Sequence, residues 1–136
     1  MAARESRMLA LGTAAPDFAL ADASGKRLAL RDFAGSKGLL VAFICNHCPF
    51  VNHLLAGFVH FAREYGPKGI AIVAINPNDA VAYPDDDFDA MKARAKAKGF
   101  AFPYLRDEDQ SVARAFGAVC TPDFFLYDSA RRLAYR

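Results

Sequence analysis

The chain has 136 residues, of which 54% are hydrophobic and 24% are charged, and its formal net charge is +2. This length and balance indicate one soluble domain with a sizeable core, and they argue against a strongly basic nucleic-acid-binding protein. No apolar run approaches the roughly 18 residues of a membrane span, and the first 15 residues lack the apolar core of a signal peptide. We therefore expect a cytoplasmic protein with neither nucleic acid nor membrane as a partner.

The first residues predict a short lead followed by a β-hairpin. Residues 1–14 are expected to form a flexible lead, and residues 15–136 a single domain. Polar and apolar residues alternate over residues 16–20, turn residues occupy 23–26, and the alternation resumes at 27–30, a pattern typical of a hairpin. One helical turn is expected at residues 30–33, before the connection that ends at Gly38.

The next stretch places two cysteines between a strand and a helix. Residues 39–44 form an apolar run that predicts a buried strand. Cys45 and Cys48 follow it with Cys-x-x-Cys spacing. From Pro49 onward, apolar residues recur every three or four positions, which predicts an amphipathic helix with proline in its first turn. The two thiols are thus expected at a strand-to-helix junction.

This junction favours thiol chemistry. The unpaired N–H groups of a first helical turn carry about half a positive charge, which stabilises a thiolate. We expect Cys45, at the very start of the helix, to be the nucleophile, and Cys48, one turn further in, to be the resolving thiol that attacks a mixed disulfide. The alternative is a pair of inert buried thiols, which such spacing at such a junction makes less frequent.

The chain then predicts a βαβ unit and a second helix. Residues 66–69 end the first helix, and residues 70–75 form a β-branched run typical of a strand in a parallel sheet. A loop is expected over 76–84, followed by a helix that begins near Asp85 and ends before Gly99. The four aspartates at positions 85, 86, 87 and 89 are interpreted as helix-capping and dipole-pairing residues in preference to a metal cluster.

The last third predicts a short extended segment, a helix and two strands. Residues 100–105 are expected to be extended. Asp107 and Gln110 have the spacing of a capping box, which predicts a helix from Glu108 to Phe116 that closes on Gly117. Strands are expected at 124–127 and 132–135. Thr121-Pro122, directly before an apolar strand, suits a cis peptide bond.

The order of these elements around Cys45-Asn46-His47-Cys48 resembles the thioredoxin-like superfamily over most of residues 12–136. The opening at residues 15–20 and the stretch from Phe43 to Val51 look like the redoxin branch, with its alkyl hydroperoxide reductase (AhpC/TSA) and peroxiredoxin-like members. The resemblance implies an α/β thioredoxin-like fold, in which a central mixed sheet with an N-terminal β-hairpin is flanked by helices. It also implies that the loop ending at cis Pro122 lies against Cys45 and Cys48 and helps to bind an extended substrate chain.

The chain departs from two patterns within that superfamily. Aligned on Cys48, Val41 stands where peroxiredoxins have a proline, and Cys45 stands where they have a hydroxyl residue. Thr121-Pro122 stands where their peroxide-orienting arginine is found, which argues against peroxidase activity. Compared with thioredoxins, Ile44 replaces a tryptophan, and Leu39 replaces the buried carboxylate that helps to deprotonate the second cysteine.

Five further residues are expected to support the site: Asn46, His47, Cys120, Thr121 and Pro122. A histidine between two cysteines is similar to the centre of protein disulfide isomerase, where an imidazolium favours the thiolate. Cys120 is interpreted either as a small buried hydrophobic residue or as a third redox thiol. His53 and His60 share one helix face and are interpreted as solvated surface residues.

The sequence therefore predicts a thiol–disulfide oxidoreductase without a cofactor or bound metal. Its expected partners are protein or small-molecule disulfides and a reductant from the thioredoxin or glutathione system. Three alternatives stay open: a thiol peroxidase, a metal-binding (copper-binding) redoxin-fold protein, and a non-catalytic interaction protein.

The end of the chain carries a separate expectation. The thioredoxin fold normally has a C-terminal helix after its last strand, and this sequence shows none, so the chain is interpreted as C-terminally truncated. An apolar patch is then expected on the sheet face formed by residues 39–44, 124–127 and 133–135, with a homodimer as one way to cover it.

Overall fold

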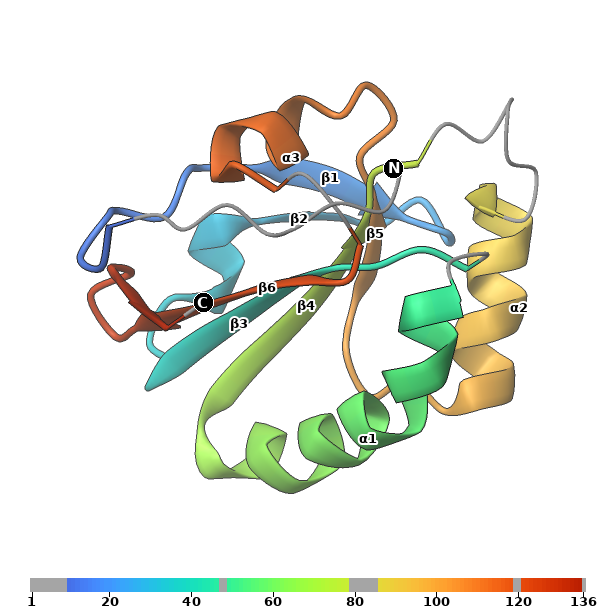
Figure 1. The fold of residues 1–136 in the computed structure, drawn as a ribbon, viewed down its shortest axis with the longest axis horizontal. Helices are drawn as coiled ribbons and strands as arrows, with labels where there is room; N and C mark the ends of the chain where they lie inside the picture. Colours follow the sequence, from blue (N-terminus) through green and yellow to red (C-terminus); the bar gives the residue numbers. More distant parts are fainter. Residues whose placement is uncertain (1–9, 47–48, 79–85, 119–120, 136) are drawn as a thin grey trace.

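A computed structural model describes residues 10–46, 49–78, 86–118 and 121–135. Its centre is a seven-stranded sheet with the order β2-β1-β5-β4-β3-β6-β7 (Figure 1). The strands are β1 (Ala19–Asp22), β2 (Arg27–Ala29), β3 (Gly38–Phe43), β4 (Ile70–Asn76), β5 (Tyr104–Arg106), β6 (Asp123–Asp128) and β7 (Leu133–Tyr135). The α-helices are α1 (Pro49–Tyr65), α2 (Phe88–Lys98) and α3 (Ser111–Phe116), and the 3-10 helices are η1 (Leu30–Phe33) and η2 (Gly66–Lys68).

The sheet is mixed, as the sequence predicts. Strands β3, β4 and β5 run parallel to one another, with α1 as the crossover between β3 and β4. Strand β6 pairs antiparallel with β3 on one side, and β1 pairs antiparallel with β5 on the other. Because β3, β4 and β5 are parallel, their carboxyl ends lie at one edge of the sheet, and β6 begins at that same edge. This edge positions the candidate site.

The predicted N-terminal hairpin and helical turn are confirmed. Strands β1 and β2 pair with Leu20 opposite Leu28. In the turn between them, one carboxylate oxygen of Asp22 accepts hydrogen bonds from the backbone N–H groups of Ser24 and Lys26, at 2.9 and 3.0 Å. An aspartate that satisfies two turn N–H groups in this way fixes the reversal of the chain. The turn after β2 is the 3-10 helix η1.

Two apolar layers cover the sheet because the side chains of β3 alternate between its faces. All six residues of β3 are buried. Leu39, Val41 and Phe43 face a core completed by α3 and the N-terminal segment. Leu40 and Ala42 face the second core, which α1 and α2 complete. Figure 1 shows α3 on one side of the sheet and α1 and α2 on the other.

Two helices begin later than the sequence predicts. Helix α2 begins at Phe88, because the side chain of Asp87 is its N-cap and accepts a hydrogen bond from the N–H of Ala90 at 2.8 Å. Helix α3 begins at Ser111 and closes on Gly117, as predicted at that end. The capping box predicted for its start is wrong. Asp107 instead accepts hydrogen bonds from the N–H groups of Val112 and Ala113, at 3.3 and 2.8 Å.

Most of the side chains expected to form an exposed apolar patch are buried or half-buried. Residues 39–44 are buried, as are Phe125, Tyr127 and Leu133. Phe124 and Leu126 are half-buried beside the α1 core. In the last strand, β7, Tyr135 is 69% exposed.

The last residues of the predicted N-terminal lead are paired with the strand at the end of the chain. Gly12 and Thr13, which the sequence analysis assigns to it, exchange backbone hydrogen bonds of 2.7 and 2.8 Å with Leu133. Residues 12–15 therefore run antiparallel beside the start of β7.

Candidate functional site: a buried cysteine beside a cis-proline loop

The candidate site lies at the edge of the sheet where β3 and β4 end and β6 begins. Cys45 and Asn46 follow β3 in the chain, and Thr121 and Pro122 directly precede β6. Strands β3 and β6 are neighbours, with Phe43 opposite Asp123, so their two flanking segments meet. Residues far apart in the sequence are thus brought together by strand pairing.

Cys45 contacts the threonine of the cis-proline loop. Its Sγ lies 3.3 Å from Oγ1 of Thr121, a hydrogen bond in which either atom can be the donor. Cys45 is 1% exposed and Thr121 is 3% exposed. The Thr121–Pro122 peptide bond is cis, as the sequence predicts. A hydroxyl at this distance can donate a hydrogen bond to the Cys45 thiolate and stabilise it.

The position of Cys45 relative to the helix differs from the prediction. Helix α1 begins at Pro49, so Cys45 lies in the segment between β3 and the helix and not in the first helical turn. The proline at the start of the helix is confirmed. His47, Cys48 and Cys120 lie outside the described residues, and their roles stay predictions.

A buried polar cluster adjoins Cys45. Its centre is Asp86, whose exposed fraction is 0%. One carboxylate oxygen accepts hydrogen bonds from the backbone N–H of Asn46, at 2.6 Å, and from the side-chain amide of Asn76, at 2.9 Å. The other oxygen accepts from the side-chain amide of Asn78, at 3.2 Å. Asp86 therefore connects the segment after β3, the end of β4 and the start of the α2 region.

Tyr104 completes this cluster from β5. Its hydroxyl donates a hydrogen bond to the side-chain oxygen of Asn46, at 2.9 Å, and accepts one from the amide of Asn76, at 3.2 Å. Burial is the main cause that raises the pKa of Tyr104 far above its ordinary value, and the negative charge of Asp86 adds to it. The hydroxyl therefore stays protonated and keeps donating to Asn46.

Four members of this cluster were not predicted from the sequence: Asn76, Asn78, Asp86 and Tyr104. Asp86 lies within a run of acids that was interpreted as helix-capping, and in the structure its neighbour Asp87 is the N-cap of α2. A signal was present in Asn76, a polar residue at the end of a β-branched run. A polar side chain at the carboxyl end of a buried parallel strand needs a hydrogen-bond partner.

These observations define the class of protein. The mixed sheet with helices on both faces, the helix that directly follows the Cys-x-x-Cys segment, and the cis-proline loop whose Thr121 contacts Cys45 are those of a thioredoxin-like fold. Residues 11–136 match the model of the AhpC/TSA family, and the chain belongs to that family.

Three comparisons place the chain among known proteins. It is 29% identical over 125 residues to the thiol-disulfide oxidoreductase ResA of Bacillus thuringiensis subsp. konkukian, an alignment that covers 87% of this chain and 64% of ResA. The crystal structure of a hypothetical protein from Sinorhizobium meliloti 1021 superposes with a TM-score of 0.94 at 52% identity, over 96% of this chain and 71% of that one. A thiol:disulfide interchange protein of the thioredoxin family from Chlorobium tepidum TLS has the same fold, with a TM-score of 0.76 at 22% identity, over 94% of this chain and 86% of that one.

The chain spans 64% of the length of the ResA protein that it matches. Among the described helices, none is both long enough and apolar enough to cross a lipid bilayer.

Proposed function

We propose that the protein is a thiol–disulfide oxidoreductase that exchanges electrons between Cys45, Cys48 and a disulfide substrate. The observation that carries this proposal is the contact of 3.3 Å between Cys45 Sγ and Thr121 Oγ1, beside the cis bond to Pro122. This contact places a candidate nucleophile against a segment that leads directly into a strand. The name of the matched ResA protein supports the same activity.

The reaction requires two thiols and no cofactor. The thiolate of Cys45 attacks one sulfur of a substrate disulfide, and the other substrate sulfur leaves as a thiolate that takes up a proton. The thiol of Cys48 loses its proton and attacks Cys45 in the mixed disulfide. This second step releases the remaining substrate thiol and leaves a Cys45–Cys48 disulfide, so two electrons have passed to the substrate. A dithiol reductant of the thioredoxin type, or glutathione, restores the protein.

The described residues prepare Cys45 for the first step. The hydroxyl of Thr121 can donate to the thiolate, which lowers the free energy of the reactive form. Asp86 holds the backbone N–H of Asn46, the residue after Cys45, and so restricts the segment that carries the sulfur. Because Cys45 is 1% exposed, the residues around it must move aside before a disulfide can reach the sulfur.

Substitution of each cysteine tests this proposal. In Cys45→Ser, we expect reduction of insulin disulfides by dithiothreitol to fall to the uncatalysed rate. In Cys48→Ser, we expect Cys45 to accumulate as a mixed disulfide with the substrate, because no intramolecular thiol can release it. Mass spectrometry of the trapped adduct identifies the attacking sulfur.

Two outcomes would contradict the proposal. Wild-type protein that reduces no disulfide would remove the activity altogether. Trapping on Cys48 in the Cys45→Ser variant, together with rapid oxidation of Cys48 by hydrogen peroxide, would assign the protein to the peroxidases instead.

A further inference from the structure

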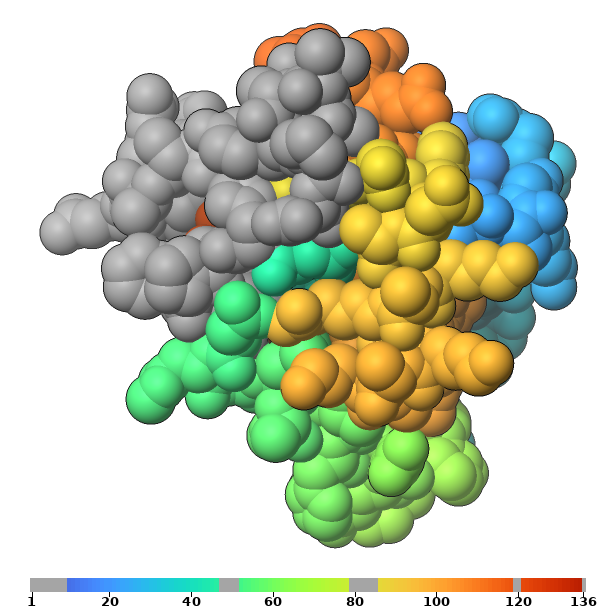
Figure 2. Space-filling view, turned by 90° about the vertical axis from the view of Figure 1, so that its right-hand side faces the viewer, coloured from blue at the N-terminus to red at the C-terminus, as the bar shows by residue number. Residues whose placement is uncertain are grey.

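A cleft opens between α1 and α2, on the face of the sheet that these helices cover. Its volume is about 520 Å³, a size that accommodates small-molecule ligands. Figure 2 shows the two helices side by side on this face of the molecule. The cleft is lined by Asn52, Leu55 and Val59 of α1 and by Arg94, Ala97 and Lys98 of α2.

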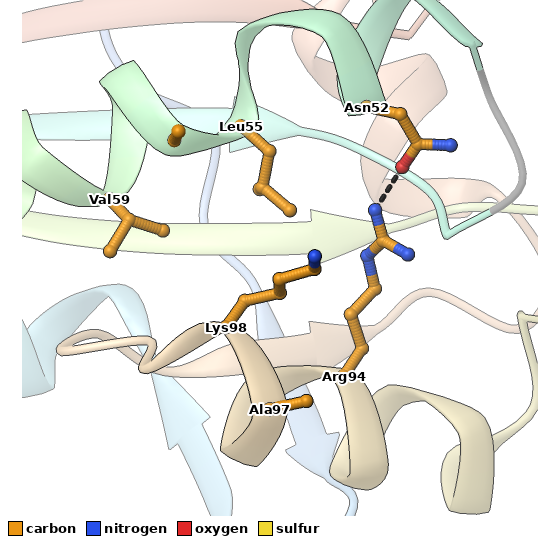
Figure 3. A pocket seen from close by; sticks show the side chains of 7 residues that line it. Asn52, Leu55, Val59, Arg94, Ala97 and Lys98 are labelled. Carbon is orange, nitrogen blue, oxygen red and sulfur yellow. Dashed lines mark hydrogen bonds between the residues drawn. The ribbon is translucent and has the colours of Figure 1, made fainter.

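Two cations of α2 converge on this cleft. Figure 3 shows the side chains of Arg94 and Lys98 reaching from α2 toward α1. Arg94 donates a hydrogen bond to the side-chain oxygen of Asn52. The ion pairs found among the described residues involve neither cation. Like charges at positions i and i+4 of a helix repel each other, and a bound anion relieves that repulsion.

The wall of the cleft contributed by Leu55 and Val59 is apolar and packs against the protein core. Leu55 and Val59 are 4% and 7% exposed, and they belong to the core between α1 and the sheet. No carboxylate occurs among the described residues that line the cleft. The cleft therefore combines a net positive charge with an apolar wall, which suits a small organic anion.

One end of the cleft lies at the start of α1. Asn52 lies in the first turn of α1, the helix that directly follows the Cys-x-x-Cys segment. At the same end, Arg94 holds Asn52 through the hydrogen bond described above. A ligand with its anionic groups at Arg94 and Lys98 can thus extend along the start of α1 toward the segment that carries Cys45.

We propose that this cleft binds the carboxylates of a small anionic disulfide, of the peptide type represented by glutathione disulfide. This inference rests on the proposed function and names its substrate class. The transfer of electrons and protons is that of the disulfide exchange described above. The two electrons of the Cys45 and Cys48 thiols reduce one molecule of glutathione disulfide to two of glutathione, and a dithiol reductant supplied in the assay restores the protein.

Three disulfides of different charge test the proposal: anionic glutathione disulfide, neutral hydroxyethyl disulfide and cationic cystamine. For each one, kcat/KM is measured with wild-type protein, Arg94→Gln, Lys98→Gln and the double variant. We expect the ratio of kcat/KM for glutathione disulfide to that for hydroxyethyl disulfide to fall about two- to fivefold in each single variant and about tenfold in the double variant. The ratio of kcat/KM for cystamine to that for hydroxyethyl disulfide should rise in the same variants.

The matched control is Lys96→Gln. It removes the same charge from the same helix at an exposed position outside the cleft lining, so it should leave the ratio unchanged. Added salt should lower the wild-type ratio and leave that of the double variant nearly constant, because screening weakens interactions between exposed charges.

An unreactive probe separates binding from catalysis. S-methylglutathione has the carboxylates but no exchangeable sulfur. In amide NMR titrations we expect saturable shifts at residues 52–59 and 94–98, and a Kd at least about tenfold weaker in the double variant. The inference would be overturned if the wild type and the double variant bound S-methylglutathione equally, or if they had the same ratio of kcat/KM for glutathione disulfide to that for hydroxyethyl disulfide. Disulfide reduction itself would persist in either case. Loss of every disulfide activity in the wild type would instead overturn the proposed function.

Discussion

Two regions of the sheet, its α3 face and its carboxyl edge, are held by different kinds of interaction. On the α3 face, an aromatic cluster joins Phe43, Phe116, Phe125 and Tyr127. The ring of Phe116 lies 5.4 Å from that of Phe43 and 5.7 Å from that of Phe125, both edge to face. At the carboxyl edge, the polar cluster of Asn46, Asn76, Asn78, Asp86 and Tyr104 is equally buried but is held by hydrogen bonds.

The two regions therefore have different roles: the aromatic cluster stabilises the fold, and the polar cluster fixes positions at the candidate site. Apolar contacts are non-directional and scale with buried area, so the aromatic cluster supplies stability with little control over the position of any one atom. Buried hydrogen bonds contribute less net free energy but have strict geometry. The polar cluster is thus the part that fixes the segment carrying Cys45.

The largest expected effect on stability comes from the aromatic cluster. Phe116→Ala should lower the free energy of unfolding by about 3–5 kcal/mol, because it removes a ring that is 1% exposed and leaves a cavity. Urea denaturation measures this. Disulfide reduction per folded molecule should be unchanged. Tyr135→Ala, which removes a ring that is 69% exposed, should cost under about 0.5 kcal/mol. Equal costs for the two variants would contradict the comparison.

A smaller loss of stability with a larger loss of activity is expected at Asp86. Asp86→Asn keeps the shape of the side chain but replaces one acceptor oxygen by an NH2 group, which then faces either the donor of Asn78 or the donors of Asn46 and Asn76. We expect a loss of about 1–3 kcal/mol in unfolding free energy, and about a tenfold loss of kcat/KM because the Cys45 segment is no longer held.

The control for Asp86 is Asp89→Asn, at an exposed position on the first turn of α2. It removes the same charge and should change neither quantity appreciably. Full activity in Asp86→Asn would show that the polar cluster has no part in positioning Cys45.

The sequence predicts most of the scaffold and only part of the site. Local signals suffice for the hairpin, for α1 and for β4, because periodicity and turn residues are properties of neighbouring positions. The contact of Cys45 with the Thr121–Pro122 loop was expected from the resemblance to a family. The bond from Asn46 to Asp86 has no local signature, because it joins two segments that only strand pairing brings together.

A third prediction concerns the Tyr104 hydroxyl. Tyr104→Phe removes the bonds to Asn46 and Asn76 but keeps the ring, so the unfolding free energy should fall by about 0.5–1.5 kcal/mol. In the wild-type protein, absorbance titration should show that Tyr104 does not ionise below the pH at which the protein unfolds, since its pKa is strongly raised. Ionisation near pH 10 in the native state would contradict the burial of this hydroxyl. Tyr65→Phe, at a partly exposed ring, is the control.

The smallest expected effect is a dependence on pH at the same edge, where the N–H of Asp107 binds the carbonyl of Asn76 at 2.9 Å. Burial raises the pKa of Asp107, against hydrogen bonds from Ala113 and Val112 that lower it. The folded state therefore holds this proton more tightly than the unfolded state does. The resulting stability is fully present below the pKa that Asp107 has in the unfolded state. It is lost as the pH rises through the higher pKa that Asp107 has in the folded state.

Comparison with Asp107→Asn isolates this contribution. The difference in unfolding free energy, wild type minus variant, should be largest near pH 3 and decline by less than about 1 kcal/mol toward pH 7. Urea titrations at several pH values measure it. A difference that grows with pH would show that the hydrogen bonds from α3 outweigh burial.

The hydrogen bond from the Asn46 N–H to Asp86 makes the opening of the site observable at one atom. An amide hydrogen held by a fully buried carboxylate exchanges with solvent deuterium only when that bond breaks. Cys45, the preceding residue, belongs to the same short segment. The exchange of the Asn46 amide therefore reports how often this segment is released from Asp86, and it can be compared between the oxidised and the reduced protein.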